Sequence, residues 1–429
     1  MTPRSYQLIV IGAHGLVGSS AFYQAAKLCA QDIASSSSLF NHPKVLGIDQ
    51  FEEGHSWGSS HGETRITRVA IGEGDEYVAL AKRSHEIWEE VETETQHEFG
   101  KLLNIKASNA IGGLIIGPAK KEDETPYHGS KGGFLQRTQS IAAEHQIPYK
   151  ILPNAELAQT FPQFKIREQD AGYCEESMGF IRPDACIKAN VRLAKKHGGE
   201  LRTGEKVLKF TRKENGKIEV VTSKARYETD KLIVAAGPWV PELIEEHAKE
   251  LKVCRQTVYH FDVKKELRDQ FTKDKFPTFI WNLDSSSIIY GFPIMGEGNA
   301  IKLGTESYAT VTTPDSVNRK VSEEEINTMY ETLIKPYLPG VTNHCVSAKV
   351  CLYTVAPQWR FVVDFMPNFG NNVIVASPCS GHGAKHAAAM GEAIAQQAIR
   401  GKSNIPVIEL FGGLLSQKED KQQQSLREF

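Results

Sequence analysis

The first fifty residues follow the order strand, turn, helix, strand. Tyr6–Ile11 is a short β-branched run that ends at a glycine, and the alanine-rich stretch from Gly18 onward has the pattern of a helix. Lys44–Asp49 is a second apolar run. A βαβ unit of this kind predicts a parallel sheet. The polar segment Ser35–Pro43, between the helix and the second strand, is typical of a surface insertion.

Beyond this unit, the apolar positions predict further helices and a second sheet. Between about Thr257 and Thr312, short β-type runs alternate with turns, a pattern typical of antiparallel strands. The C-terminal segment Gln417–Phe429 is polar and is expected to fray. Further strands are predicted at Ile105–Gly117, Lys206–Thr211, Asp230–Trp239 and Asn372–Ala376, and helices at Tyr77–Thr95, Lys131–Glu144, Ala185–Gly198 and His382–Arg400.

Composition excludes several classes of protein. Hydrophobic residues make up 40% and charged residues 24%, and Lys+Arg 50 against Asp+Glu 52 gives a net charge of −2. Such a chain has no overall field that favours nucleic acid or a membrane surface, and no apolar run approaches the length of a membrane span. The seven cysteines form no Cys-x-x-Cys pair and no disulfide framework. Together with the absence of a signal segment, this predicts a cytoplasmic protein.

The first turn carries candidate nucleotide-binding residues. Gly12, Gly15 and Gly18 lead into the first helix, whose N-terminal N–H groups and positive dipole end suit a pyrophosphate. The loop departs from Gly-x-Gly-x-x-Gly, because His14 stands where the second glycine is expected and one extra residue is present. Asp49 ends the second strand, where an acidic side chain accepts hydrogen bonds from a ribose. The arrangement predicts a dinucleotide but does not separate NAD from FAD.

Three later motifs are more specific. Gly58–Arg68 contains His-Gly-Glu-Thr-Arg-x-x-Arg, Val350–Thr354 contains Cys-x-Tyr-Thr, and Ser380–Lys385 reads Ser-Gly-His-Gly-Ala-Lys. In all three the chain resembles the monomeric sarcosine oxidase family. Gly179–Asp184 and Gly237–Trp239 extend the likeness over nearly the whole chain.

The resemblance implies an α/β fold with two domains. One is a Rossmann-like FAD-binding domain of the glutathione-reductase type, and the other is a β-rich antiparallel substrate domain. The FAD-binding domain would be built from residues 1–101, 151–239 and 357–429, and the substrate domain from 102–150 and 240–356. The FAD is expected to be covalent, through Cys351, because a thiolate is a competent nucleophile toward the 8α position of the flavin.

The resemblance also implies a role for each motif residue. Arg68 and Lys385 would hold a substrate carboxylate, and Tyr290 and Tyr353 would wall the pocket. Lys302 would activate O₂, because a fixed ammonium stabilises superoxide-like charge. The residues expected to contact FAD are Gly12, Gly15, Gly18, Asp49, His61, Thr64, Arg65, Cys351, Gly381, His382 and Gly383.

The expected reaction is oxidation of the C–N bond of a secondary amine or N-substituted amino acid, which gives an imine, then the free amine, and H₂O₂. Two departures from the family bear on the substrate. Glu306 stands where the family has a histidine, and a carboxylate facing the pocket would favour a cationic or polyhydroxylated substrate group. The sequence does not decide whether Glu306 faces the pocket. Pro378-Cys379 replaces Gly-Phe. Fructosyl amino acids, pipecolate and saccharopine therefore remain open as substrates.

Two other classes of protein share some of these features. An NAD-dependent dehydrogenase would use the same βαβ unit, and a non-catalytic flavoprotein would bind FAD without releasing peroxide. The expected partners are the amine or amino-acid substrate and O₂, with no nucleic acid and no membrane, and the resemblance implies a monomer. His382 and His386 have a spacing that also suits a metal, but no His-Glu-x-x-His context accompanies them, and no metal is expected.

Overall fold

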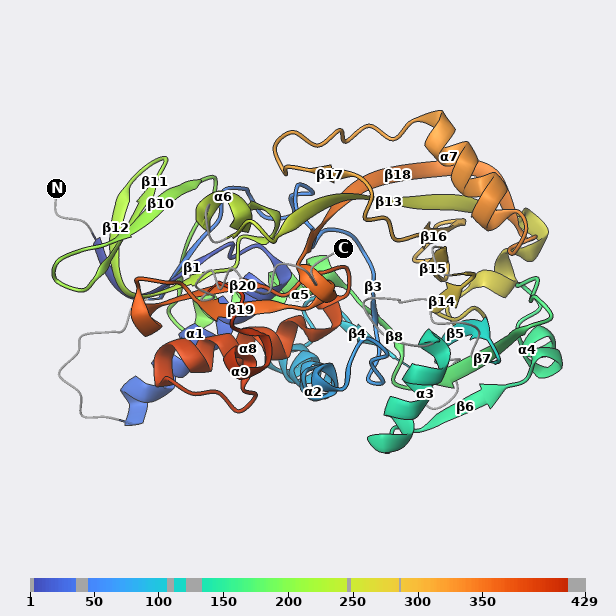
Figure 1. Cartoon of the computed structure of the whole chain (residues 1–429), viewed down its shortest axis with the longest axis horizontal. Coiled ribbons are helices and arrows are strands. Elements are labelled where there is room, and N and C mark those ends of the chain that lie inside the picture. Colours follow the sequence, from blue (N-terminus) through green and yellow to red (C-terminus); the bar gives the residue numbers. More distant parts are fainter. Residues whose placement is uncertain are drawn as a thin grey trace, which may run out of the picture.

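The computed structural model describes residues 4–35, 45–105, 112–120, 133–244, 248–284 and 287–415. Two large sheets lie side by side along the long axis of the molecule (Figure 1). The predicted tail Gln417–Phe429 and the predicted insertion, apart from Ser35, lie outside the described residues. Among the described helices, none combines the length and the apolar character that crossing a membrane requires.

The first sheet has a parallel centre. β1 (Arg4–Ile11) pairs in parallel with β2 (Val45–Ile48) and with β12 (Arg226–Val234). β9 (Glu200–Arg202) extends the sheet beside β2, and β20 (Val373–Ser377) extends it beside β12. The predicted βαβ unit and its parallel sheet are therefore confirmed. The antiparallel members are β10 (Val207–Arg212), β11 (Ile218–Thr222) and β19 (Val362–Phe365).

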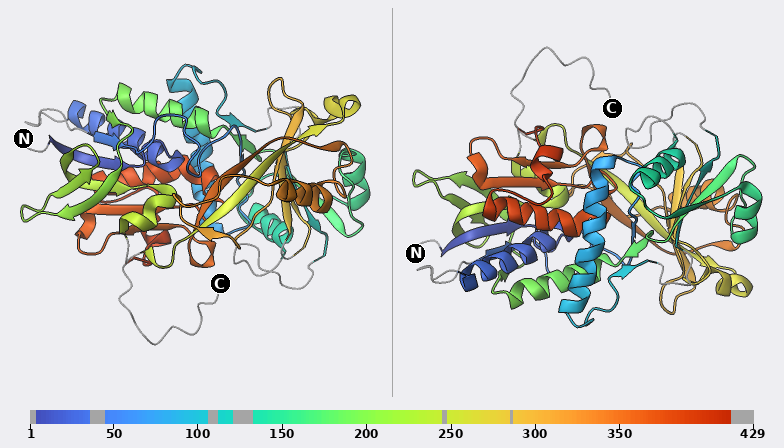
Figure 2. Two further views of the ribbon diagram at one scale, coloured as in Figure 1. Left: turned by 90° about the horizontal axis from the view of Figure 1, so that it is seen from above. Right: turned by 90° about the horizontal axis from the view of Figure 1, so that it is seen from below.

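Helices cover one face of this sheet. α1 (Leu16–Ser35) packs against α5 (Pro183–Lys196) and α8 (Ala387–Arg400), and α2 (Val78–Glu94) packs against α8 (Figure 2). Successive residues of a strand point to opposite faces. Accordingly, Leu8 and Val10 of β1 belong to the core beneath these helices. Ile9 and Ile11 belong to a second core, which α6 (Val240–Ile244) helps to cover, and α9 (Val407–Phe411) packs beside β19.

The second sheet is antiparallel apart from one pair of strands, as the pattern between Thr257 and Thr312 predicts. Its order is β17–β13–β16–β15–β14–β5–β7–β6, and β18 also pairs with β13. The strands are β5 (Gly113–Pro118), β6 (Tyr149–Leu152), β7 (Asp170–Glu175), β13 (Lys252–Val263), β14 (Phe279–Asn282), β15 (Ile288–Phe292), β16 (Ala300–Gly304), β17 (Val311–Thr312) and β18 (Val341–Val355). The helices beside it are α3 (Phe134–Glu144), α4 (Asn154–Thr160) and α7 (Glu323–Met329).

A small third sheet lies between the two large ones (Figure 1). It consists of β3 (Arg65–Thr67), β8 (Gly179–Ile181) and β4 (Leu103–Asn104), all paired antiparallel. β3 carries one of the predicted motifs, so this motif is held at the junction of the two large sheets.

The strand pairing moves two of the predicted domain boundaries. β7 falls in the segment 151–239, which was expected in the FAD-binding domain, but it pairs with β5 and β6 in the second sheet. Conversely, α6 falls in the segment 240–356 but packs in the core of the first sheet. Pairing between distant segments decides which sheet a strand joins, and the local pattern of residues does not contain that information. We therefore propose a two-domain division that follows the sheets.

Candidate functional site

A single large cavity contains nearly all the predicted site residues. Its volume is about 350 Å³, and it is lined by turns of the first sheet and by strands of the second. Among the predicted residues, only the His61 side chain lies outside its lining. The others are Gly12, Gly15, Gly18, Asp49, Thr64, Arg65, Arg68, Tyr290, Lys302, Glu306, Cys351, Tyr353, Gly381, His382, Gly383 and Lys385.

The glycine turn at one end of the cavity tolerates no side chain at two positions. Gly12 has a φ of +88°, and a Cβ there would lie 2.3 Å from the carbonyl oxygen of Ala235. A Cβ on Gly18 would lie 2.0 Å from the carbonyl oxygen of Gly12. The extra residue of the loop is accommodated before the helix begins, where the His14 N–H donates to Asp49 Oδ2 at 2.8 Å. This hydrogen bond links the glycine turn to Asp49, the acidic residue that follows β2.

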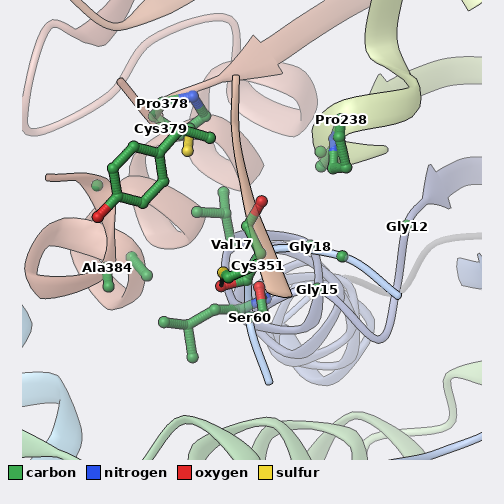
Figure 3. A pocket seen from close by; sticks show the side chains of 18 of the residues that line it. Gly12, Gly15, Val17, Gly18, Ser60, Pro238, Cys351, Pro378, Cys379 and Ala384 are labelled. Carbon is green, nitrogen blue, oxygen red and sulfur yellow. Dashed lines mark hydrogen bonds between the residues drawn. The ribbon is translucent and has the colours of Figure 1, made fainter. Parts of the chain in front are cut away.

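Arg65 holds the loop that precedes β3. Its guanidinium donates to the carbonyl oxygens of Ser59 and His61 at 2.9 and 2.8 Å, and to that of Thr64 at 2.9 Å. It also approaches Cys351 Sγ on β18 to 3.7 Å. Figure 3 shows Cys351 and the glycines of the turn among the residues that line the cavity. Arg65 thus links the loop before β3 to the strand that carries the cysteine.

Lys302 is a buried amine in the middle of β16. Its Nζ donates to the carbonyl oxygen of Thr64 at 2.8 Å and to Thr64 Oγ1 at 3.2 Å, and it lies 4.9 Å from the centre of the Phe292 ring. Burial lowers the pKa of Lys302 well below its ordinary value, and the positive charge of Arg65 lowers it further. The structure thus fixes one nitrogen against the loop that Arg65 organises.

Arg68 and Lys385, the predicted carboxylate-binding pair, are brought together around a carboxylate of the chain itself. Arg68 Nη2 lies 2.5 Å from Glu73 Oε2, and Lys385 Nζ lies 3.4 Å from Glu73 Oε1. The side chains of Arg68 and Glu73 are only 1% and 4% exposed. Sequence reasoning missed Glu73, although its place in Gly72-Glu-Gly, five residues after Arg68, is a signal that could have found it.

Glu73 affects the charge state of Lys385. Burial lowers the pKa of Lys385 to about 8, and the negative charge of Glu73 opposes that shift. The Lys385 Nζ also donates to the carbonyl oxygen of His382 at 2.8 Å. Arg68, Lys385 and Glu73 thus place two cations and one anion where a substrate carboxylate was expected, and the negative charge of Glu306 also acts on Lys385.

Two tyrosines and a glutamate line the remainder of the cavity. Burial raises the pKa of both the Tyr290 and Tyr353 hydroxyls. Both therefore stay protonated at neutral pH. Glu306 faces the cavity, and the Tyr308 hydroxyl donates to its Oε2 at 3.1 Å. The question that the sequence left open about the direction of Glu306 is thus answered. Cys379 also lines the cavity (Figure 3).

The His61 side chain lines a smaller cavity of about 20 Å³, which shares His14 and Ser60 with the large one. Burial lowers the pKa of His61 to about 3, and the charge of Arg65 contributes. The His61 carbonyl oxygen accepts from the Arg65 guanidinium. His386 is fully buried, and among the described residues no cluster of three or more metal-binding side chains is found.

Comparison with known proteins identifies the family. The model of the family described as FAD dependent oxidoreductase (DAO) matches residues 7–397. The chain belongs to this family. It is 32% identical to a monomeric sarcosine oxidase of Arthrobacter sp. strain TE1826, with 97% of the chain and 98% of the relative covered. It is 28% identical to an N-methyl-L-tryptophan oxidase of Yersinia pestis strain Pestoides F, with 91% and 94% covered.

Solved structures agree on the fold of this FAD-dependent oxidoreductase. NikD, an amino acid oxidase of nikkomycin biosynthesis, superposes with a TM-score of 0.76 at 18% identity, over 95% of the chain and 97% of NikD. The fructosamine oxidase of Aspergillus fumigatus gives 0.70 at 15% identity, over 97% and 92%. The predicted fold class, the predicted family and the predicted dependence on FAD are confirmed, and the NAD-dependent alternative is set aside.

The residues present fit a bound FAD. The close contacts of Gly12 and Gly18 leave the start of α1 open to the cavity, as a pyrophosphate requires. Asp49 accepts from the His14 N–H of this turn, and Cys351 lines the same cavity. The cavity thus brings together the residues expected at the phosphates, at a ribose and at the flavin.

The buried ion pair predicts a stability effect. Replacing Glu73 by glutamine leaves Arg68 and Lys385 as buried cations without their shared anion, so the free energy of unfolding should fall by about 3 kcal/mol. The control is Glu86→Gln, which removes an exposed partner of Arg83 and should change it by less than about 1 kcal/mol. Chemical denaturation measures both changes. Equal effects of the two variants would contradict the structural importance of Glu73.

Proposed function

We propose that this FAD-dependent oxidoreductase is an oxidase of the C–N bond of a secondary amine or N-substituted amino acid, similar to sarcosine, with O₂ as the acceptor. The observation that carries the proposal is the position of the Arg68–Lys385 pair and of Lys302 around one cavity. The Arg68–Lys385 pair can hold a carboxylate, and the buried amine of Lys302 can interact with O₂. The names of the two oxidase relatives support the same reaction class.

Substrate binding depends on Arg68 and Lys385. A substrate carboxylate would be attracted by these two cations, and a guanidinium binds a carboxylate through two parallel hydrogen bonds. Glu73 keeps the two cations close together when no substrate is present. Anchoring the carboxylate in this way would orient the carbon next to the amine, and orientation lowers the entropic part of the barrier.

The glycine turn and Cys351 would hold the FAD, which would supply two-electron redox chemistry between the amine and O₂, with H₂O₂ as the reduced product. Tyr290 and Tyr353, both protonated, would exclude water and donate hydrogen bonds to the substrate. Lys302 would stabilise the negative charge that develops on O₂. Burial disfavours the ammonium form of Lys302, but an anion that forms beside it favours that form at the moment it is needed.

Covalent attachment of the FAD through Cys351 is part of the proposal. In Cys351→Ser, acid precipitation should release all the flavin, whereas in the unaltered protein the yellow colour should stay with the washed, denatured chain. Cys345→Ser is the matched control, because Cys345 lies on the same strand but does not line the cavity. Absorbance of pellet and supernatant measures the outcome. Retention of the flavin in Cys351→Ser would place the bond at another residue.

The role proposed for Lys302 predicts a split between the two half-reactions. Lys302→Met should slow reoxidation by O₂ about 100-fold or more, the usual cost of removing a group that stabilises transition-state charge. Reduction by substrate should slow much less. Stopped-flow absorbance separates the two rates, and Lys209→Met, an exposed lysine on β10, is the control. If the rate of reoxidation were unaffected, a group other than Lys302 would have to stabilise the charge that develops on O₂.

We propose that Glu306 determines substrate specificity by binding a cationic or polyhydroxylated group of the substrate next to the reacting bond. Glu306→Gln keeps hydrogen-bonding capacity but removes the charge. For a substrate with a second cation, KM should rise about tenfold or more, because a charge-assisted hydrogen bond is lost. A polyhydroxylated substrate should lose less, and sarcosine least. Glu297→Gln, at an exposed turn, is the control. Equal changes for all substrates would remove Glu306 from the specificity site.

The most direct test of the reaction is a peroxide-release screen over N-methyl, cyclic and glycated amino acids. Release of H₂O₂ with any of them supports the oxidase, and the best substrate distinguishes a sarcosine-like enzyme from a pipecolate, saccharopine or fructosyl-amino-acid oxidase. A flavin-containing protein that released no peroxide with any amine would favour a non-catalytic flavoprotein. We also infer a cytoplasmic monomer, from the scattered cysteines and from the family resemblance respectively.

A further inference from the structure

The first N–H groups of α1 are not all available to a ligand. In a dinucleotide-binding turn, the N–H groups at the start of the helix face the pyrophosphate. Here the Gly15 N–H donates to the carbonyl oxygen of Gly12 at 2.9 Å, and the Leu16 N–H donates to Ser60 Oγ at 3.0 Å. The Ser60 side chain, which comes from a different loop, therefore occupies one of the N–H donors at the start of the helix, that of Leu16.

The Ser60 hydroxyl is placed to act in place of that donor. A hydroxyl can donate one hydrogen bond and accept two, so accepting from the Leu16 N–H leaves its own proton available. Ser60 lines the large cavity together with Gly15, Val17 and Cys351 (Figure 3). Its oxygen therefore lies between the helix N-terminus and the space in which the cofactor fits.

The backbone on both sides of Ser60 is fixed. Arg65 donates to the carbonyl oxygen of the preceding residue, Ser59, and to that of the following residue, His61. The sulfur of Cys351 lies 3.7 Å from the same Ser59 oxygen. A donor held on both sides loses little conformational entropy when it binds a ligand.

We propose that Ser60 is a phosphate ligand of FAD. Its hydroxyl accepts from the Leu16 N–H and donates to an oxygen of the pyrophosphate, so the loop before β3 completes the cradle that the glycine turn begins. The proposal goes beyond the oxidase reaction, because it holds whichever amine is the substrate. It also implies that one loop, organised by Arg65, contributes to both the phosphate end and the flavin end of the cofactor site.

The test uses full-length Cys351→Ser protein freed of flavin, with ADP and adenosine as probes. ADP carries the pyrophosphate and adenosine does not. Adding Ser60→Ala should weaken ADP binding about tenfold or more, because a hydrogen bond to a charged group is lost, and should leave adenosine binding unchanged. Ser60→Thr keeps a hydroxyl and should restore most of the affinity. Isothermal titration calorimetry measures each dissociation constant, and Ser56→Ala, at an exposed position outside the cavity, is the control.

A second variant separates phosphate binding from capping of α1. Ser60→Asp keeps an acceptor for the Leu16 N–H but presents a negative charge to the phosphates, so ADP should bind more weakly than in Ser60→Ala. If ADP affinity were unchanged in both variants, or if ADP and adenosine affinities fell together, the proposal would be wrong. Should adenosine bind too weakly to measure, the release rate of FAD, followed by flavin fluorescence, takes its place and should rise about tenfold in Ser60→Ala. None of these readouts depends on amine oxidation, so the oxidase proposal can fail independently.

Discussion

The guanidinium of Arg65 connects the parts of the site that come from different sheets. It donates to three carbonyl oxygens of the preceding loop and reaches Cys351 on the second sheet. A planar group with five N–H donors can hold several carbonyl oxygens in one geometry, which the ammonium of a lysine cannot do. Thr64, which Arg65 also holds, in turn accepts from Lys302. Arg65 thus links the loop before β3 to the strand that carries the cysteine, and this loop in turn contacts the buried lysine.

Burial determines which charged groups can lie together in the rest of the cavity. Arg68 and Lys385 lie in a place from which water is excluded, and two cations could not remain there without an anion. Glu73 supplies that anion when the pocket holds no substrate. The same reasoning applies to Lys302, whose pKa is lowered by burial and by Arg65. A site of this kind responds strongly to one added negative charge, which is the common feature of a carboxylate substrate and of reduced oxygen.

Local sequence patterns predict the βαβ unit, the antiparallel region and the motif residues, because each of these depends on neighbouring residues. The pattern fails where distant segments meet. β7 joins the second sheet through pairing with β5, and nothing in its own six residues specifies that partner. The contact of Ser60 with Leu16 could not be predicted for the same reason, since 44 residues separate them, whereas Glu73 lies only five residues from Arg68 and was within reach of a local reading. His61 was placed in the motif by its neighbours in sequence, but the local pattern did not predict that its carbonyl oxygen would accept from Arg65.

The roles proposed for Lys302 and Glu306 agree with the different ways in which the two residues are held. Lys302 is in the interior of β16 and pairs with His260 and Phe292 on both neighbouring strands, so its position is fixed. The strand ends at Gly304, where a Cβ would lie 2.5 Å from the Tyr290 hydroxyl. Glu306 follows two residues later, outside any ladder of hydrogen bonds. On the proposed roles, a change at position 306 would alter what the pocket recognises while the strand keeps the lysine in place.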